Sequence, residues 1–262
     1  MKTYADVQIL TAKKAQIRNG DRVLDCGTGP AASLALRLAK LVGEKGKVVA
    51  IDCEREYIPK IKDAIAKSSL SNRVSFLVAD LRYTPIRDSS MDASLSLDTV
   101  QNMHGNGGNP EDTVKAYIKE SARAIKSGGK LVVGTRFPVP RNVAQRAYME
   151  YRLFSRKLEY ALWKEISRYY FEHELISWFN EARLRDTEVD IIEHKILFPR
   201  DFLSRRRERV GPSLDKVAAR STREELRKEF HKLLKTTEKY GEEWLPTLLI
   251  SATKTGRSAR AK

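Results

Sequence analysis

The chain has 262 residues with 49 Lys or Arg and 34 Asp or Glu, a formal net charge of +15. This length supports one large domain with additions. No apolar run approaches the roughly 18 residues needed to span a bilayer, and the N-terminus lacks a signal-peptide pattern, so we expect a cytoplasmic protein without a membrane span. The basic excess favours a polyanionic partner, although a surface rich in Lys, Arg and Glu is also typical of heat adaptation.

In the first half of the chain, short apolar runs alternate with helical patterns. Strands are predicted at residues 23–26, 47–51, 74–78, 91–97 and 130–135, and helices at 3–18, 31–42, 54–67 and 111–126. Near-continuous apolar strands separated by helices are typical of a parallel sheet covered on both faces. The fold class is therefore α/β, a Rossmann-like arrangement.

The second half interrupts this alternation. Residues 142–180 are helical in pattern and rich in aromatic residues, and further strands are predicted at 189–197 and 247–253. We divide the chain into a main domain, a basic helical insertion and a basic tail. The main domain comprises residues 1–197, including the aromatic segment 141–182, together with 246–253; the insertion is 198–245 and the tail 254–262.

A glycine turn follows the first predicted strand, and acids end the strands. Gly27 and Gly29 allow the backbone to approach a ligand, and the predicted strands end at Asp25, Asp52, Asp80 and Asp98. Ligands of open parallel sheets bind at this carboxyl edge. Asp52 lies 23 residues after Gly29, where a carboxylate accepts hydrogen bonds from ribose hydroxyls. A nicotinamide dinucleotide fits these two features as a first interpretation.

Taken together, these residues resemble the class I S-adenosylmethionine-dependent methyltransferases. Asp25, Gly27 and Gly29 match the family's DxGxGxG motif, with Ala31 in place of the third glycine. The resemblance implies a seven-stranded, mostly parallel sheet with an antiparallel seventh strand, helical insertions at the carboxyl edge, and S-adenosylmethionine as cofactor. It places Asp52 on the ribose and Asp80 at the adenine amino group. The implied cofactor-binding residues are Asp25, Gly27, Thr28, Gly29, Asp52, Cys53, Asp80, Leu81 and Asp98, and no metal is implied.

The segment after the fourth strand, residues 97–104, is expected to face the methyl acceptor. Asp98 can position an amine, Asn102 can form a hydrogen bond, and His104 can act as a base, so these three are the catalytic candidates. The segment lacks the Asn-Pro-Pro-Tyr pattern of many amino-directed nucleic-acid methyltransferases. Methylation through a cysteine adduct is disfavoured, because neither Cys26 nor Cys53 lies on the acceptor side.

Basic residues concentrate in the insertion, where residues 195–235 hold 13 Lys or Arg against 6 Asp or Glu. Arg205, Arg206, Arg207 and Arg209 are candidates for gripping phosphates, or they form ion pairs at a solvated helix end. The main hypothesis is a nucleobase methyltransferase acting on a nitrogen, with an exocyclic amine favoured, in structured RNA such as rRNA or tRNA. The alternatives are a small-molecule methyltransferase for a quinone, amine or lipid precursor, a non-enzymatic scaffold, and protein lysine methylation.

Overall fold

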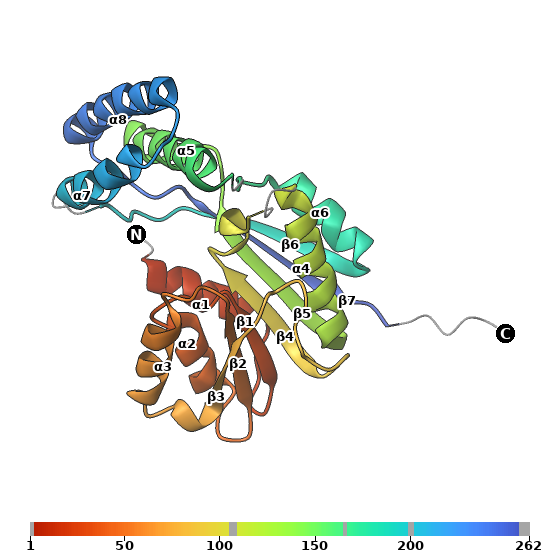
Figure 1. Ribbon diagram of the computed structural model, residues 1–262. Coiled ribbons are helices and arrows are strands. Elements are labelled where there is room, and N and C mark those ends of the chain that lie inside the picture. Colours follow the sequence, from red (N-terminus) through yellow and green to blue (C-terminus); the bar gives the residue numbers. More distant parts are fainter. Residues whose placement is uncertain (1–2, 105–108, 165–166, 199–201, 257–262) are drawn as a thin grey trace.

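A single seven-stranded sheet organises the computed structural model, which describes residues 3–104, 109–164, 167–198 and 202–256. Its strand order is β3-β2-β1-β4-β5-β7-β6, with β7 antiparallel to both neighbours and the other pairings parallel. The predicted fold class is confirmed (Figure 1). The strands are β1 (Arg22–Cys26), β2 (Lys47–Asp52), β3 (Val74–Val78), β4 (Met91–Leu97), β5 (Ile125–Arg136), β6 (Leu184–Ile192) and β7 (Thr247–Lys254).

Helices cover both faces of the sheet because successive strand residues alternate sides. Val23 belongs to the core beneath α1 (Tyr4–Lys14), α2 (Ser33–Leu41) and α3 (Ile58–Ala66). Leu24 belongs to the core beneath α4 (Pro110–Ala124) and α6 (Glu172–Glu181) on the other face (Figure 1). Among the described residues, no helix is long and apolar enough to cross a membrane.

Several element boundaries differ from the sequence prediction. β5 begins at Ile125 rather than at residue 130, and α1 ends at Lys14 rather than at residue 18. The sixth strand begins at Leu184 rather than residue 189 and ends at Ile192 rather than 197, because the alternating apolar pattern of an exposed edge strand is weak. The aromatic segment is not one continuous helix. It forms α5 (Val143–Trp163), which ends at Lys164 in the left-handed conformation (φ +59°), and the separate helix α6.

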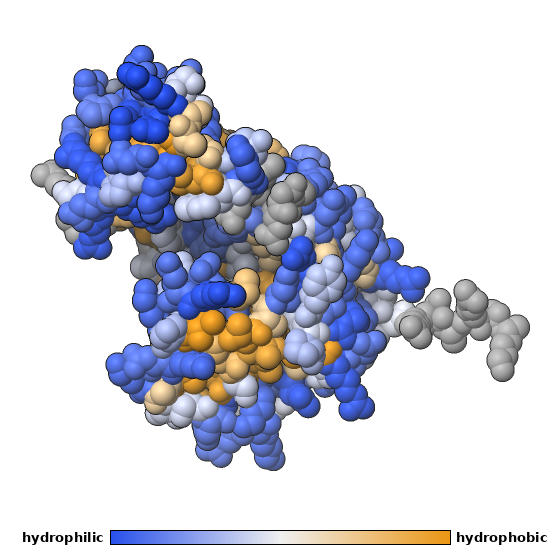
Figure 2. Space-filling model, viewed as in Figure 1, coloured by the Kyte–Doolittle hydropathy of each residue, from blue (hydrophilic) through white to orange (hydrophobic). Residues whose placement is uncertain are grey.

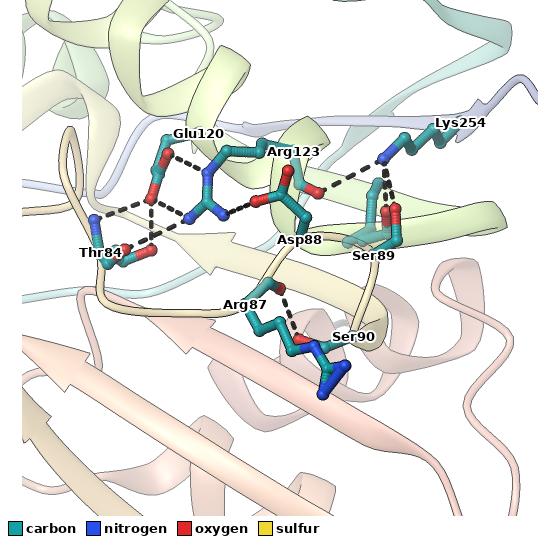
Figure 3. A network of polar contacts seen from close by, with 9 residues as sticks. Thr84, Arg87, Asp88, Ser89, Ser90, Glu120, Arg123 and Lys254 are labelled. Atoms are coloured by element: carbon teal, nitrogen blue, oxygen red, sulfur yellow. Dashed lines mark hydrogen bonds and ion pairs between the residues drawn. The ribbon is translucent and has the colours of Figure 1, made fainter. Parts of the chain in front are cut away.

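The connection between β3 and β4 contains no helix. Its residues 79–90 are tied to α4 by a polar network in which the Glu120 carboxylate accepts hydrogen bonds from Thr84 N at 2.8 Å and Arg123 Nε at 2.8 Å (Figure 3). The Arg123 guanidinium also pairs with Asp88. This connection leaves β1–β3 without a helix on the face that it crosses. Figure 2 shows an apolar patch on that face, and Val49, Leu77 and Ile86 are only partly buried.

Helices α5, α7 (Phe202–Asp215) and α8 (Arg220–Tyr240) form a lobe beyond the carboxyl ends of the central strands (Figure 1). The lobe has its own core, which includes Phe154 stacked on Phe230 at 5.4 Å. Residues 105–108, and residues 257–262 of the predicted tail, lie outside the described residues.

Arg206 is a structural part of this lobe. Its guanidinium forms a two-pronged ion pair with Glu242 and lies 3.2 Å from the centre of the Tyr151 ring. Both side chains are buried, with Arg206 4% exposed. The Glu242 carboxylate also accepts a hydrogen bond from Thr237 Oγ1 at 2.7 Å. Removing one partner of such a pair leaves an uncompensated buried charge.

We expect Arg206→Met to lower the free energy of unfolding by about 3–5 kcal/mol, because Glu242 is left buried and unpaired. Arg207→Met is the matched control, because Arg207 pairs with Glu238 at the surface and its loss costs about 1 kcal/mol or less. Urea denaturation of both variants measures the difference. Equal losses would contradict the structural role of Arg206.

Candidate active site

The glycine turn after β1 lies against the end of β2. Gly27 N and Thr28 N donate hydrogen bonds to the Ile51 carbonyl at 2.8 and 3.0 Å. Gly27 has φ +76° and Gly29 has φ +66°, the left-handed region that favours glycine. A Cβ on Gly27 would lie 2.3 Å from Thr99 Cγ2, so the turn packs tightly against the segment after β4.

Asp25 shapes this turn from within. Its side chain is buried, 1% exposed, and its Oδ2 accepts a hydrogen bond from Thr28 Oγ1 at 2.6 Å. Burial raises the pKa of the Asp25 carboxyl to about 6, although the hydrogen bond from Thr28 acts to lower it. With almost no exposed surface, Asp25 serves the predicted cofactor site by holding the turn.

Asp52 joins the turn to the end of β2. Its Oδ2 accepts a hydrogen bond from Gly29 N at 2.9 Å, and its Oδ1 accepts one from Glu54 N at 2.9 Å. Each carboxylate oxygen has a second lone pair for a ribose hydroxyl. The neighbouring Cys53 is exposed, although partial burial and then Asp52 raise the pKa of its thiol.

Asp80, at the end of β3, is held by a neighbour that the sequence prediction did not include. The Arg82 guanidinium donates to both carboxylate oxygens, with Nη2 at 2.6 Å from Oδ2. These hydrogen bonds lower the pKa of Asp80. Arg82 therefore competes with an adenine amino group for Asp80, while Leu81 packs on the sheet core beside them.

These residues fit S-adenosylmethionine. The register aligns Cys26 with Ile51 and Asp52 with Val78, so the glycine turn and the ends of β2 and β3 form one edge. The turn brings its backbone close to this edge without side chains in the way, and Asp52 offers carboxylate lone pairs there. The glycine turn, Asp52 and Asp80 thus follow one another along the sheet, in the order predicted for a glycine backbone, a ribose acceptor and an adenine acceptor.

Beside the cofactor edge, Asp98 and Arg136 form a buried ion pair at the ends of β4 and β5. Arg136 Nη2 lies 2.5 Å from Asp98 Oδ2, and the arginine side chain is 3% exposed. Asp98 adopts φ +59°, which is strained for a non-glycine residue, and its N–H donates to the Gly134 carbonyl at 2.8 Å. The predicted catalytic carboxylate is therefore fixed and paired.

Arg136 has four further contacts, one of which is the hydrogen bond from its Nη1 to Thr247 Oγ1 at 3.3 Å. Its Nη1 lies 3.2 Å from His194 Nε2, and its guanidinium lies 4.0 Å from the centre of the Trp244 ring. Because arginine only donates, His194 Nε2 is the acceptor, which places the imidazole proton on Nδ1. Burial and then Arg136 lower the pKa of His194 to about 4, so it is neutral at pH 7. The guanidinium also approaches Tyr4, whose pKa is raised by burial and by Asp98.

The other two catalytic candidates lie in the same segment. Asn102 donates from Nδ2 to the Asp98 carbonyl at 2.9 Å and accepts at Oδ1 from Arg152 Nη2 at 3.0 Å. The His104 carbonyl accepts a hydrogen bond from Thr113 Oγ1 at 3.2 Å. Asp98 and Asn102 are thus in contact, and the role of His104 as a base stays a prediction.

The predicted arginine cluster does not form one surface. Arg206 is buried with Glu242, and Arg207 pairs with Glu238. Arg205 is engaged with neighbouring groups and Arg209 is exposed. In the described part of the chain, Arg206 and Arg207 thus contact acids of the lobe rather than Asp98 or Asn102. Their contact with RNA stays a prediction, and for Arg206 burial disfavours it.

Sequence reasoning missed the residues that enclose the acceptor side. Arg136 directly follows the predicted fifth strand, and the rule that strand ends carry functional side chains would have found it. No comparable signal marks His194, Trp244, Arg152 or Tyr169. His194 follows the edge strand β6, Arg152 and Tyr169 lie in the aromatic segment 141–182, and Trp244 precedes β7. Only tertiary packing brings them to the segment that begins at Asp98 and to its partner Arg136.

Comparison with known proteins agrees with this geometry. Residues 23–129 match a family model described as a methyltransferase domain. A ubiquinone/menaquinone biosynthesis C-methyltransferase from Teredinibacter turnerae is 28% identical over 139 residues, 53% of this chain and 52% of that protein. The chain therefore spans about half the length of the curated relatives it matches.

Solved structures share the fold at lower identity. A cyclopropane-fatty-acyl-phospholipid synthase-like protein from Lactobacillus casei has a TM-score of 0.71 at 18% identity, covering 94% of this chain and 89% of that one. A Haemonchus contortus phosphoethanolamine N-methyltransferase, solved with phosphomonomethylethanolamine and S-adenosylhomocysteine, has a TM-score of 0.57 at 15% identity, covering 96% and 53%. Residues 23–129 are therefore similar to a methyltransferase domain, and the chain has the fold of the class I S-adenosylmethionine-dependent methyltransferases.

The first test of the cofactor site uses the turn. We expect Gly27→Ala to weaken binding of S-adenosylhomocysteine by about tenfold or more, because a left-handed alanine costs about 1–2 kcal/mol and its Cβ meets Thr99. Isothermal titration calorimetry measures the affinity. Ala31→Gly, at an exposed position of the same turn, should bind as the wild type does. Unchanged affinity of Gly27→Ala would contradict the site.

The second test uses the pKa of Asp25. Because its folded-state pKa is about 6 and its ordinary value 3.8, the folded protein holds a proton that the unfolded chain releases between these values. Stability from this group is present at pH 4 and lost as the pH rises through 6. We expect Asp25→Asn to avoid this loss, about 3 kcal/mol between pH 4 and pH 7. Urea denaturation at both pH values measures it, and parallel changes in both proteins would count against the assignment.

Proposed function

We propose that the protein transfers a methyl group from S-adenosylmethionine to a small organic acceptor bound between the carboxyl edge of the sheet and α5. A quinol is the leading acceptor class, because the curated relatives are quinone C-methyltransferases. The observation that carries this proposal is the enclosure of the Asp98 segment by aromatic and arginine side chains.

The enclosure comes from α5 and the segment that follows it. Arg152 contacts Asn102, and Arg156 Nη2 donates to the Gln101 carbonyl at 3.3 Å. The Arg156 guanidinium stacks on Tyr169 at 4.0 Å from the ring centre. A polynucleotide would have to pass between α5 and the sheet edge, where these contacts lie. A small planar acceptor needs only the space beside the rings.

Methyl transfer requires the protein to position the acceptor beside the methyl group, and no covalent bond between protein and substrate is needed. Bound S-adenosylmethionine supplies an electrophilic methyl group, and the acceptor displaces its sulfur in line. The Asp98–Arg136 pair holds the segment after β4 rigidly at the sheet edge, next to the glycine turn. The rings of α5 and residues 167–170 exclude water from the reacting atoms. A proton lost from the acceptor has Asp98 and His104 as candidate acceptors.

Methylation of a nucleobase in structured RNA is the second candidate. It is supported by the net charge of +15 and by exposed basic residues such as Arg209 on α7. The curated relatives favour the small-molecule proposal over it. An RNA partner and a cytoplasmic location both stay predictions.

One assay separates the two candidates. Purified protein is incubated with methyl-labelled S-adenosylmethionine and either a short-chain 1,4-benzoquinol kept reduced or total cellular RNA. We expect label in the organic extract of the quinol reaction and none in RNA. Gly29→Val, which places a branched side chain at φ +66°, is the control without a functional cofactor site. Label in RNA alone, lost in the control, would overturn the proposal.

A further inference from the structure

Two arginines on one face of α5 point toward the acceptor side. Arg152 and Arg156 are four residues apart, so they lie one above the other on the helix. Arg152 reaches the Asn102 side chain and Arg156 reaches the Gln101 carbonyl, immediately after Asp98. Both side chains are part-buried.

Neither arginine forms an ion pair with an acid in the described part of the chain. By contrast, Arg136, Arg168 and Arg206 each pair with a carboxylate. Arg156 Nε is buried and has no hydrogen-bond partner. A guanidinium cannot deprotonate to relieve this, so the protein maintains two positive charges at the site that no carboxylate contacts directly.

The surrounding groups do not cancel these charges. Arg136 is neutralised by Asp98, and His194 is neutral because its pKa is lowered to about 4. Glu159, on the same helix, acts on the pKa of both guanidinium groups through its charge, but its carboxylate accepts a hydrogen bond from Ser155 Oγ at 3.2 Å rather than from either of them. The net charge facing the acceptor therefore comes from Arg152 and Arg156.

The immediate neighbours of the two guanidinium groups are aromatic. Arg156 stacks on the Tyr169 ring, and the Tyr169 hydroxyl, which makes no hydrogen bond of ordinary geometry, lies close enough to Arg152 to help raise its pKa. Tyr148 lies one turn before Arg152 on the same helix and also acts on its pKa. Guanidinium donors beside tyrosine rings and hydroxyls suit an aromatic or planar ligand that carries an oxyanion.

We propose that Arg152 and Arg156 bind a carboxylate or phosphate group of the acceptor, so that the substrate is an anionic small molecule oriented with its reacting atom toward the glycine turn. This inference rests on the proposed small-molecule function and names the chemical class of its substrate. The anion supplies the charge that the site lacks, and the paired guanidinium groups fix its orientation through charge-assisted hydrogen bonds.

Binding of simple probes tests the proposal without knowledge of the true substrate. The full chain, saturated with S-adenosylhomocysteine, is titrated calorimetrically with benzoate, phenyl phosphate and the neutral isostere benzamide. We expect at least one anion to bind about tenfold or more tightly than benzamide. Preference for benzoate identifies a carboxylate acceptor, and preference for phenyl phosphate identifies a phosphate acceptor.

Variants assign the preference to the two arginines. Arg152→Gln combined with Arg156→Gln should remove the preference for the anion, and the corresponding Lys variants should keep part of it, because the charge remains without the forked geometry. Arg146→Gln, an exposed position on the same helix, should bind as the wild type does. Melting temperature and S-adenosylhomocysteine affinity confirm that each variant is folded. Equal binding of anions and benzamide, or a preference that survives the double Gln variant, overturns the proposal.

The result of the anion-binding experiment can be distinguished from the result of the methylation assay. Anion binding that depends on the arginines, together with methylation of RNA alone, would retain the anion site and reject the small-molecule function. Methylation of a neutral quinol that is unaffected by the double Gln variant would retain that function and reject the anionic acceptor.

Discussion

The acceptor side depends on the ion pair between Asp98 and Arg136. These two residues lie at the carboxyl ends of neighbouring parallel strands, so the ion pair joins the two strand ends. The chain leaves the sheet at Asp98, whose backbone is strained. Buried charges are stable only when they are paired and hydrogen-bonded, and Arg136 meets this condition through Asp98, His194 and Trp244. The ion pair thereby connects the central strands to the segment that precedes β7.

Local sequence signals predicted the geometry of the candidate cofactor site. Strand-end acids and turn glycines act through backbone geometry within a few residues, so Gly27, Gly29 and Asp52 could be placed without the fold. The five central strands were also predictable, because a sheet buried on both faces requires continuous apolar runs. The sixth strand was misplaced because an exposed edge strand needs no such run.

The acceptor side could not be predicted in the same way. Arg206 and Arg207 are adjacent in an arginine-rich segment, yet one is buried with Glu242 and the other lies at the surface with Glu238. Their partners lie more than thirty residues away in the chain. Likewise, Arg152 and Arg156 resemble any exposed helical arginines until α5 packs over Gln101 and Asn102. The number of basic residues does not distinguish ion pairs from ligand contacts.

A crystal structure of the protein with S-adenosylhomocysteine tests the central claim most directly, namely that methyl transfer takes place between the sheet edge and α5. We predict that the ribose hydroxyls bind Asp52 and that the sulfur faces the space bounded by Thr99, Arg152 and Tyr169. A sulfur atom that faces the solvent on the α7 side, or a ligand bound away from the glycine turn, would contradict this account.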